Sequence, residues 1–176
     1  YYEKEVISRL SRTQNSVIAG QLLPTTKAGL ALQNSYIINN PHDVGKKDAF
    51  QGLINENIYG QTHRNYHPFF KDFVKEFGYY DLFLINLEGT IIYTVFKEID
   101  LGTSLVNGPY KSSNFATVFQ RAKETLSENI VFFSDFEPYM PSYNSPAAFV
   151  TSPVYNHGEK IGVIALQFPV EKINEI

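Results

Sequence analysis

YYDLFLINLEGTIIYTVF, residues 79–96, holds two runs of aliphatic, β-branched and aromatic residues on either side of a short polar segment. Strands favour these residue types, and the polar segment Leu87–Thr90 carries a glycine suited to a tight turn. The pattern predicts a β-hairpin.

The sequence after this hairpin predicts one helix and three more strands. A Gly-, Pro- and Ser-rich connection leads to a helix expected over about 113–126, with Ser112 or Ser113 as its N-cap. Its inward side would hold Phe115, Val118, Phe119, Ala122 and Leu126. The strands are expected at 130–134, 147–155 and 160–168, with a tight turn at 156–159. Pro169 suits the first position of a last helix.

The sequence before the hairpin predicts helices. Residues 3–23 carry a narrow apolar stripe, which suits a partner helix better than a broad core. The stripe consists of Val6, Leu10, Thr13, Val17 and Gln21. Pro24 interrupts the helix, a second segment runs over 25–38, and NNPHD at 39–43 predicts a loop.

A third helical region is expected over 46–77, interrupted near Tyr59–Gly60 and ended by Gly78 as C-cap. Pro68 would be tolerated only in a first turn. The second half has an aromatic face made of Tyr66, Phe69, Phe70, Phe73 and Phe77.

These elements predict an α+β fold of the PAS-like kind, with a five-stranded, mostly antiparallel sheet and helices packed on one side. We divide the chain into an N-terminal helical region, 1–60, and a PAS-like module, 61–176.

Composition narrows the classes of function. The net charge of −3 gives no electrostatic footprint for nucleic acid, and the absence of cysteine excludes disulfides, thiolate catalysis and Cys-ligated metals. No segment approaches the roughly 18 continuous apolar residues of a membrane span. The chain begins without Met and stops in what we expect to be mid-helix, so we interpret it as a piece of a longer protein.

No phosphate-binding, dinucleotide-binding, nucleophile-elbow or zinc-protease motif is present. His63 and His67, four residues apart on a helix, would need a third ligand to hold a metal, and the alternative is a pair of partly exposed polar residues. Asp135 and Glu137 would point to opposite faces of an extended segment, which disfavours a catalytic pair. We expect Asp135 inward and Glu137 outward, although a capping or loop role for Asp135 is equally open.

Two segments suggest a pocket. Tyr93 and Lys97 share one face of the second hairpin strand, which would be a pocket wall or a solvated face, while Glu98 lies on the other face with Phe96. The long connection 97–110 is expected to pass over the sheet opposite SDFEPYMPSY, 134–143, so that the two form the walls of a small-molecule pocket.

Residues 78–113 (GYYDLFLINLEGTIIYTVFKEIDLGTSLVNGPYKSS) and 134–176 (SDFEPYMPSYNSPAAFVTSPVYNHGEKIGVIALQFPVEKINEI) resemble a known family. They are similar to the extracytoplasmic Cache sensor domains, PAS-like modules of bacterial methyl-accepting chemotaxis proteins and of related membrane-bound kinases and cyclases. The similarity covers about residues 60–176, and the N-terminal helices match in position and character only.

The resemblance implies a periplasmic domain between two transmembrane helices that binds a small metabolite, with no cofactor, and forms a homodimer through the N-terminal helix. In the amino-acid receptors of this family, an aromatic and Arg cluster binds the ligand carboxylate and a later Asp binds the ammonium. Tyr66, with His63 or Arg64, lies near the first position and Asp135 near the second. No Trp is available, the spacing differs and only one sheet module is present.

Three functions remain open on the sequence. The first is a non-enzymatic ligand-binding sensor for an amino acid, amine or carboxylate, attached to a chemoreceptor or to a kinase or cyclase. The second is a small hydrolase using Asp135 with a histidine, and the third is a dimerisation domain with a filled cavity. For the sensor, the expected ligand-binding residues are His63, Tyr66, Tyr93, Lys97, Tyr110, Asp135, Tyr139 and Phe149.

Overall fold

The computed structural model describes residues 1–8, 19–52 and 57–170, and it shows an α+β fold built on one antiparallel sheet. The sheet has six strands in the order β2-β1-β6-β5-β3, and β4 also pairs with β5. Its strands are β1 (Asp81–Ile85), β2 (Ile91–Thr94), β3 (Phe132–Phe133), β4 (Glu137–Tyr139), β5 (Ser145–Asn156) and β6 (Glu159–Pro169). The predicted fold class is confirmed, with β4 as an additional strand.

Both predicted hairpins are present, and a glycine with positive φ lies in each turn. Gly89, with φ 85°, lies between β1 and β2, where the Asn86 N–H donates to the carbonyl of Thr90. Gly158, with φ 81°, follows His157 between β5 and β6. Glycine adopts this conformation without the steric cost that a Cβ adds, so these turns set the register of the β1–β2 and β5–β6 pairings.

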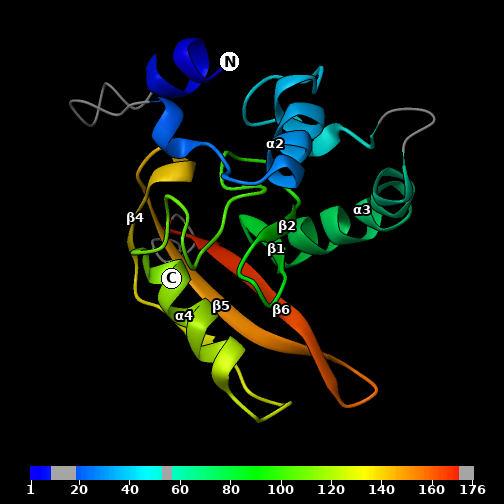
Figure 1. Cartoon of the computed structure of the whole chain (residues 1–176), viewed down its shortest axis with the longest axis vertical. Coiled ribbons are helices and arrows are strands. Elements are labelled where there is room, and N and C mark those ends of the chain that lie inside the picture. The colour runs from blue at the N-terminus through cyan, green and yellow to red at the C-terminus, as the bar shows by residue number, and fades with distance from the viewer. Residues whose placement is uncertain (9–18, 53–56, 171–176) are drawn as a thin grey trace.

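The two main helices cover opposite faces of the sheet (Figure 1). Leu82 on β1 packs in a cluster with Val74 of α3 (Ile58–Phe77). Phe83, which points to the other face, packs with Phe115 of α4 (Asn114–Glu124). The expectation of helices on one side was wrong, because the hydrophobic pattern of a strand shows that both faces are buried but not which helix buries each.

The face covered by α4 carries the larger core, which is rich in aromatic rings. Phe115 and Phe149 stack with ring centroids 4.2 Å apart, and Phe83 lies 4.9 Å from Phe115. All three side chains are fully buried, and each such burial stabilises the fold by roughly 1.5–3 kcal/mol. Ser113 caps α4 by accepting a hydrogen bond from the Ala116 N–H, as predicted.

The N-terminal region packs on the end of the sheet near the 97–110 connection. It contains helical turns at Tyr2–Ile7, Ala19–Leu22, Asn34–Ile38 and Lys47–Ala49, and the helix α2 (Lys27–Gln33), which Thr26 caps. Gln33 of α2 donates to the carbonyls of Ile99 and Leu101, at 2.7 and 2.9 Å. Gly29 lies against Gly102 so closely that a Cβ on Gly29 would be 2.3 Å from the Gly102 carbonyl oxygen. These contacts hold the connection in place.

The dimer stripe expected along residues 3–23 is described only at its two ends. Val6 is fully buried and packs in the main core cluster of its own chain, together with Tyr2 and Leu22. Leu10, Thr13 and Val17 lie outside the described residues. The homodimer therefore stays a prediction.

The third helical region differs from its prediction. α3 begins at Ile58, so Tyr59–Gly60 lies in its first turn, and the helix runs through Pro68 to the predicted C-cap Gly78. Its aromatic face is largely solvated, with Tyr66, Phe69 and Phe77 each more than half exposed. The face that packs on the sheet instead buries Gly60, His63, His67 and Val74. The expectation of partly exposed histidines was therefore wrong.

Three smaller predictions also fail. Leu126 is 95% exposed because α4 ends two residues earlier, at Glu124. β3 is only two residues long and its Phe133 is exposed, so the 130–134 run is not a buried strand. Pro169 is the last residue of β6, and helical conformation begins one residue later than predicted, at Val170. The rest of the predicted final helix lies outside the described residues.

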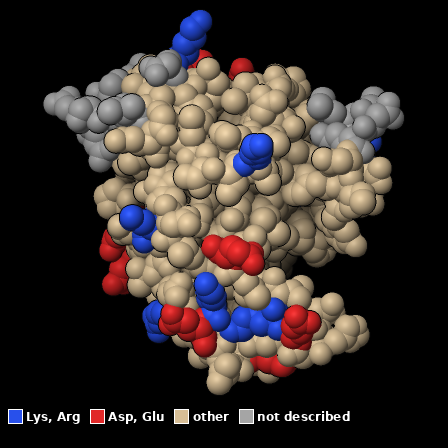
Figure 2. Space-filling model, in the orientation of Figure 1, with Lys and Arg blue, Asp and Glu red and all other residues tan. Residues whose placement is uncertain are grey.

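The surface mixes charges of both signs. In Figure 2, Lys, Arg, Asp and Glu side chains gather around α4, and much of the remaining face is uncharged. Among the helices that the structure describes, none is long and apolar enough to cross a membrane.

Candidate functional site

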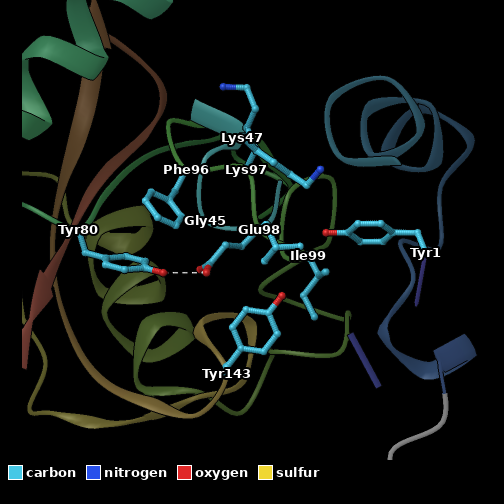
Figure 3. A pocket seen from close by; sticks show the side chains of 10 residues that line it. Tyr1, Gly45, Lys47, Tyr80, Phe96, Lys97, Glu98, Ile99 and Tyr143 are labelled. Atoms are coloured by element: carbon cyan, nitrogen blue, oxygen red, sulfur yellow. Dashed lines mark hydrogen bonds between the residues drawn. The ribbon is translucent and has the colours of Figure 1, made fainter. Parts of the chain in front are cut away.

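A cavity of about 210 Å³ opens where the 97–110 connection meets the N-terminal region and the start of β1. We name it the acidic pocket. Its walls are Tyr1, Val44, Gly45, Lys47, Tyr80, Phe96, Lys97, Glu98, Ile99 and Tyr143. Figure 3 shows aromatic rings of Tyr80, Phe96 and Tyr143 around the side chain of Glu98.

Glu98 is the acidic side chain of this pocket, and two hydroxyl groups hold it. The Tyr80 hydroxyl donates to Oε1 at 2.8 Å and the Ser142 hydroxyl donates to Oε2 at 2.7 Å. Ser142 in turn accepts a hydrogen bond from Nε2 of Gln167, near the end of β6. The carboxyl group is thus fixed in orientation and connected to the last strand.

Two buried aspartates interact electrostatically with Glu98. Asp81 accepts three backbone N–H bonds at Oδ1, from Leu82, Val95 and Phe96, at 2.7–3.0 Å. Asp100 accepts the Tyr139 hydroxyl at Oδ2, at 2.8 Å. In the described part of the chain, the second oxygen of each aspartate is buried without a hydrogen-bond partner.

The three carboxyl groups, which we name the acidic cluster, resist ionisation. Burial, followed by the charge of Asp100, raises the pKa of Asp81 to about 8. Burial and then Asp100 also raise the pKa of Glu98 well above its usual value, and burial raises the pKa of Asp100 to about 6. No Lys or Arg of residues 1–8, 19–52 and 57–170 forms an ion pair with any of the three.

The local backbone explains how this cluster forms. β2 ends at Thr94, and the next N–H groups turn toward Asp81 or, for Lys97, toward the Thr94 hydroxyl at 2.7 Å. Lys97 itself has φ 61°, a left-handed conformation uncommon for a residue with a side chain. This turn directs the Lys97 ammonium and the Glu98 carboxyl to different surroundings.

The cationic wall of the acidic pocket is Lys47. Its ammonium donates to the carbonyls of Ile37 and His42, at 2.8 and 3.0 Å, and lies 5.3 Å from the centre of the Tyr1 ring. Burial lowers the pKa of Lys47. The pocket therefore presents a carboxyl group and an ammonium group on separate walls.

Lys97 belongs to a second polar group, the histidine cluster of His63, His67, Tyr93 and Lys97. His67 Nε2 lies 2.8 Å from the Asp48 carbonyl, which can only accept, so Nε2 carries the proton. Nδ1 then accepts the Tyr93 hydroxyl at 2.7 Å. The Lys97 ammonium lies 3.4 and 3.3 Å from these two ring nitrogens.

Burial keeps the bases of the histidine cluster neutral. It lowers the pKa of His63 to about 3 and that of His67 to about 4, with the nearby Lys97 charge as the second cause in both. Burial also lowers the pKa of Lys97 to about 7, which the charge of Asp81 partly offsets. No group of three or more acidic and histidine side chains placed to bind a metal occurs among the described residues.

The eight expected ligand-binding residues do not form one site. His63, Tyr66 and Tyr93 line a separate cavity under α3, whereas Lys97 lines the acidic pocket and its ammonium contacts the ring of His67. Tyr110, Tyr139 and Phe149 are buried together in the main core.

Asp135 is exposed, so the expectation that it points inward was wrong, whereas Glu137 is exposed as expected. β3 ends at Phe133, and Asp135 contributes only its carbonyl, which accepts from Asn114. In the part of the chain that the structure describes, no hydrogen bond joins Asp135 to a histidine, so the hydrolase arrangement is not formed.

The two segments expected to face each other across a pocket instead touch directly. Tyr139 bonds to Asp100 and Ser142 bonds to Glu98, so 134–143 and 97–110 form one packed unit. The pocket lies beside this contact. The sequence reasoning placed Phe96 and Glu98 on one face correctly but did not select Glu98, Asp100 or Asp81. The sequence signal that could have identified the cluster is Asp81, an acidic residue at the start of the apolar run DLFLI.

No protein-family model and no curated protein matches the chain. Similar solved structures include the sensor domain of the Vibrio cholerae histidine kinase DctB, with TM-score 0.49 and 14% identity over 98% of this chain and 57% of that chain. Another is the sensory domain of the Campylobacter jejuni chemoreceptor Tlp3 with isoleucine bound, with TM-score 0.46 and 18% identity over 98% of this chain and 61% of that chain. The chain thus spans about three fifths of the length of these solved chains.

Proposed function

We propose that this chain is the ligand-binding sensor module of a membrane receptor, and that its ligand is a small metabolite carrying a protonated amine. The observation that supports this most directly is Glu98, a carboxyl group held by two hydroxyls inside an aromatic-walled pocket and backed by two more buried acids.

A bound ammonium group would supply the positive charge that the acidic cluster lacks. It would favour the ionised form of Glu98, and the aromatic rings of Tyr80, Phe96 and Tyr143 would add cation–π attraction. The cavity of about 210 Å³ is smaller than the roughly 300 Å³ typical at the lower limit for drug-sized ligands, which favours a small metabolite.

Contact with Lys47 would distinguish two classes of amine ligand. An amino acid would direct its carboxylate to the Lys47 ammonium, whereas a simple amine would leave Lys47 with its two backbone carbonyls. Carboxylates without an amine fit less well, because they would meet the acidic cluster.

A path for the signal follows from the contacts of Glu98. Ligand binding would pull Glu98 from Ser142, and Ser142 bonds to Gln167 near the C-terminal end of β6. A small shift there would be transmitted toward the C-terminus, which in the family leads to the second membrane helix.

The receptor context rests on the sequence resemblance of residues 78–113 and 134–176. It comprises an extracytoplasmic location, flanking transmembrane helices, a homodimer through the N-terminal helix and a chemoreceptor output, with a histidine kinase or a nucleotide cyclase as the alternative. The binding function is non-enzymatic.

Calorimetric titration of the 176-residue chain with ethanolamine, alanine and acetate tests the proposal. We expect ethanolamine or alanine to bind and acetate not to bind. Glu98→Gln should weaken amine binding about tenfold or more, because a charged pair is lost. Glu137→Gln, at an exposed carboxylate, is the control and should change nothing.

Lys47→Met assigns the subclass, since it should weaken alanine and leave ethanolamine unchanged. Acetate binding as well as alanine, or equal amine affinity in Glu98→Gln, would overturn the proposal. Insensitivity to every compound would instead favour the dimerisation domain, since the main core around Phe115 and Phe149 is already filled by its own rings.

A further inference from the structure

Two neighbouring strands each carry a buried side chain with an oxygen that lacks a hydrogen-bond partner. In the part of the chain that the structure describes, these atoms are Oδ2 of Asp81 on β1 and Oε1 of Gln167 on β6. Asp81 is 0% and Gln167 2% exposed. A buried acceptor without a donor is costly, so we expect a donor that serves these oxygens.

The register of the sheet brings the two side chains together. Asp81 and Gln167 are paired directly across β1 and β6, so both side chains lie on the same face of the sheet. Directly paired residues of antiparallel strands have Cβ atoms about 4.5–5.5 Å apart. The short carboxyl side chain and the longer amide side chain can therefore meet through their unpaired oxygens.

A proton on Asp81 is the donor that satisfies both atoms. Oδ1 of Asp81 already accepts three backbone N–H groups, so the proton belongs on Oδ2. Burial raises the pKa of Asp81 to about 8, so the carboxyl group is protonated at neutral pH. Its O–H can then donate to Oε1 of Gln167 while the backbone bonds to Oδ1 remain.

The other titratable and charged groups around Asp81 have different partners. These groups are Tyr80, Tyr93, Lys97, Glu98 and Asp100. The hydroxyl of Tyr80 donates to Glu98, that of Tyr93 donates to His67, and the Lys97 ammonium donates to the Val95 carbonyl. The Tyr110 hydroxyl, which also lacks a partner in the described chain, interacts most strongly with the charge of Asp100.

Gln167 connects Asp81 to the acidic pocket. Its Nε2 donates to Oγ of Ser142 at 3.1 Å, and the Ser142 hydroxyl donates to Oε2 of Glu98 at 2.7 Å. With a proton on Asp81, every donor in this chain therefore points from β1 toward Glu98.

Loss of the proton would reverse the chain. Oδ2 of Asp81 would become an acceptor, and a half-turn of the Gln167 amide, which exchanges its oxygen and nitrogen with little change in shape, would present Nε2 to it. The Ser142 hydroxyl would then donate to Oε1 of Gln167, and Glu98 would lose the Ser142 bond. The proton itself passes to water.

We propose that Asp81, Gln167, Ser142 and Glu98 form a proton-controlled switch, in which the proton on Asp81 directs the hydrogen bonds toward Glu98 and its loss reverses them. The switch would make the acidic pocket and the end of β6 respond to pH without any ligand. It is therefore independent of the amine site proposed above.

NMR titration of the ligand-free 176-residue chain from about pH 6 to about pH 10 tests the switch. We expect the carboxyl carbon signal of Asp81 and the side-chain amide signals of Gln167 to change together, with one midpoint near pH 8. Nuclear Overhauser contacts of the Gln167 amide protons should move from the Ser142 side chain to the Asp81 side chain. The Asn114 amide, which donates to the carbonyls of Asp135 and Ala147, is the internal control and should not change.

Asp81→Asn should hold the chain in its low-pH form. The new amide nitrogen takes the place of the Oδ2 hydroxyl as a permanent donor to Gln167, and the acceptor Oδ1 is kept. The Gln167 signals should then stay at their low-pH positions over the whole range. Asp135→Asn, the same change at an exposed aspartate, is the matched control and should retain the transition.

Constant Gln167 signals, or a midpoint more than about one pH unit from that of the Asp81 carboxyl, would overturn the switch. A transition that persists in Asp81→Asn would overturn the role of Asp81. Contacts to Ser142 that remain at high pH would mean that Gln167 responds only to a nearby charge, which overturns the reversal. If Asp81→Asn does not fold, the two midpoints and the contacts in the native chain decide the question.

Discussion

The acidic cluster and the histidine cluster are both buried near the end of the sheet, and burial shifts their pKa values in opposite directions. It raises those of Asp81, Glu98 and Asp100 and lowers those of His63, His67 and Lys97. In both clusters burial favours the uncharged form. Lys97 lies between the two clusters, since its side chain lines the acidic pocket and its ammonium lies within 3.4 Å of both ring nitrogens of His67.

Each cluster also combines a member that holds the fold with a member whose side chain lines a cavity. Asp81 binds three backbone N–H groups, and His67 connects Tyr93 to Asp48. Glu98 and His63, in contrast, line cavities. Burial alone therefore does not identify a binding residue, because Asp81 and His67 are buried as well but line neither cavity.

The largest effect is expected for Asp81. Asp81→Ala removes the acceptor of the Leu82 and Phe96 N–H groups, each costing about 1–3 kcal/mol when left unpaired, so the free energy of unfolding should fall by about 2–6 kcal/mol. The Val95 N–H keeps a second acceptor, the Leu82 carbonyl at 3.1 Å. Asp81→Asn keeps an acceptor oxygen and should lose less than half of that. Urea denaturation measures both, with the exposed Asp135→Ala as a control expected within about 0.5 kcal/mol of the native chain. Equal losses in Asp81→Ala and Asp135→Ala would contradict this role.

The next largest effect on stability is expected in the histidine cluster. His67→Phe leaves the Tyr93 hydroxyl and the Asp48 carbonyl without a partner, at a cost of about 2–3 kcal/mol. His63→Phe removes two nitrogens that make no hydrogen bond in the described part of the chain, so it should cost less than about 1 kcal/mol. Denaturant unfolding of the two variants side by side checks the order, and a more damaging His63→Phe would reverse our assignment.

The pH dependence of stability should differ in sign between the clusters. Asp81 has a raised pKa of about 8 in the fold, so it favours the folded state at low pH and this contribution is lost as pH rises above about 4. His63 has a lowered pKa of about 3, so its contribution is present above about pH 6.5 and is lost as pH falls. Either group changes stability by at most about 1.4 kcal/mol per pH unit.

The opposite pH dependences of Asp81 and His63 can be separated by comparing the stability of the native chain with that of a variant of each residue. From pH 5 to pH 7, the stability of the native chain should fall relative to Asp81→Asn, whereas from pH 4 to pH 6 it should rise relative to His63→Phe. Urea unfolding at several pH values gives both curves. If both stability differences changed in the same direction with pH, one of the two clusters would be solvated.

The parts of the fold that the sequence predicted are those set by local pattern. The hairpin turns at Gly89 and Gly158, the Ser113 cap and the inward side of α4 depend on residues close in the chain. The side of α3 that packs on the sheet is not set by nearby residues alone, because either its aromatic side or its histidine side could pack there in an amphipathic helix. Hydrophobicity favoured the aromatic face, but the partners Tyr93 and Asp48 lie 26 and 19 residues from His67 and made the histidine face the buried one.

The candidate site was predicted only in part for the same reason. Strand alternation placed Tyr93 with Lys97 and Phe96 with Glu98, and the structure keeps Lys97 with Tyr93 in the histidine cluster and Glu98 with Phe96 in the acidic pocket. The acidic cluster depends on contacts of Ser142 and Tyr139 across about forty residues, with separations of 44 and 39. Such pairs carry no local pattern, so Asp135, which is acidic and near a strand end, was selected in their place.

The smallest expected effect distinguishes two neighbouring tyrosines in the core. Tyr110 and Tyr139 have ring centroids 6.0 Å apart and both are buried, but only the Tyr139 hydroxyl has a partner, Asp100, among the residues that the structure describes. Tyr139→Phe should lower the free energy of unfolding by about 1 kcal/mol, since it removes that hydrogen bond and leaves Asp100 with neither oxygen bonded to a side chain. Tyr110→Phe should be neutral or slightly stabilising, because it removes a buried hydroxyl that bonds to nothing in the described chain.

Thermal unfolding of both variants at neutral pH measures the difference. A loss of stability in Tyr110→Phe as large as that in Tyr139→Phe would mean that the Tyr110 hydroxyl also has a partner. The acidic cluster would then extend to Tyr110, and more of its buried polar atoms would be hydrogen-bonded than in the histidine cluster. Glu98 and His63 would then have less similar surroundings.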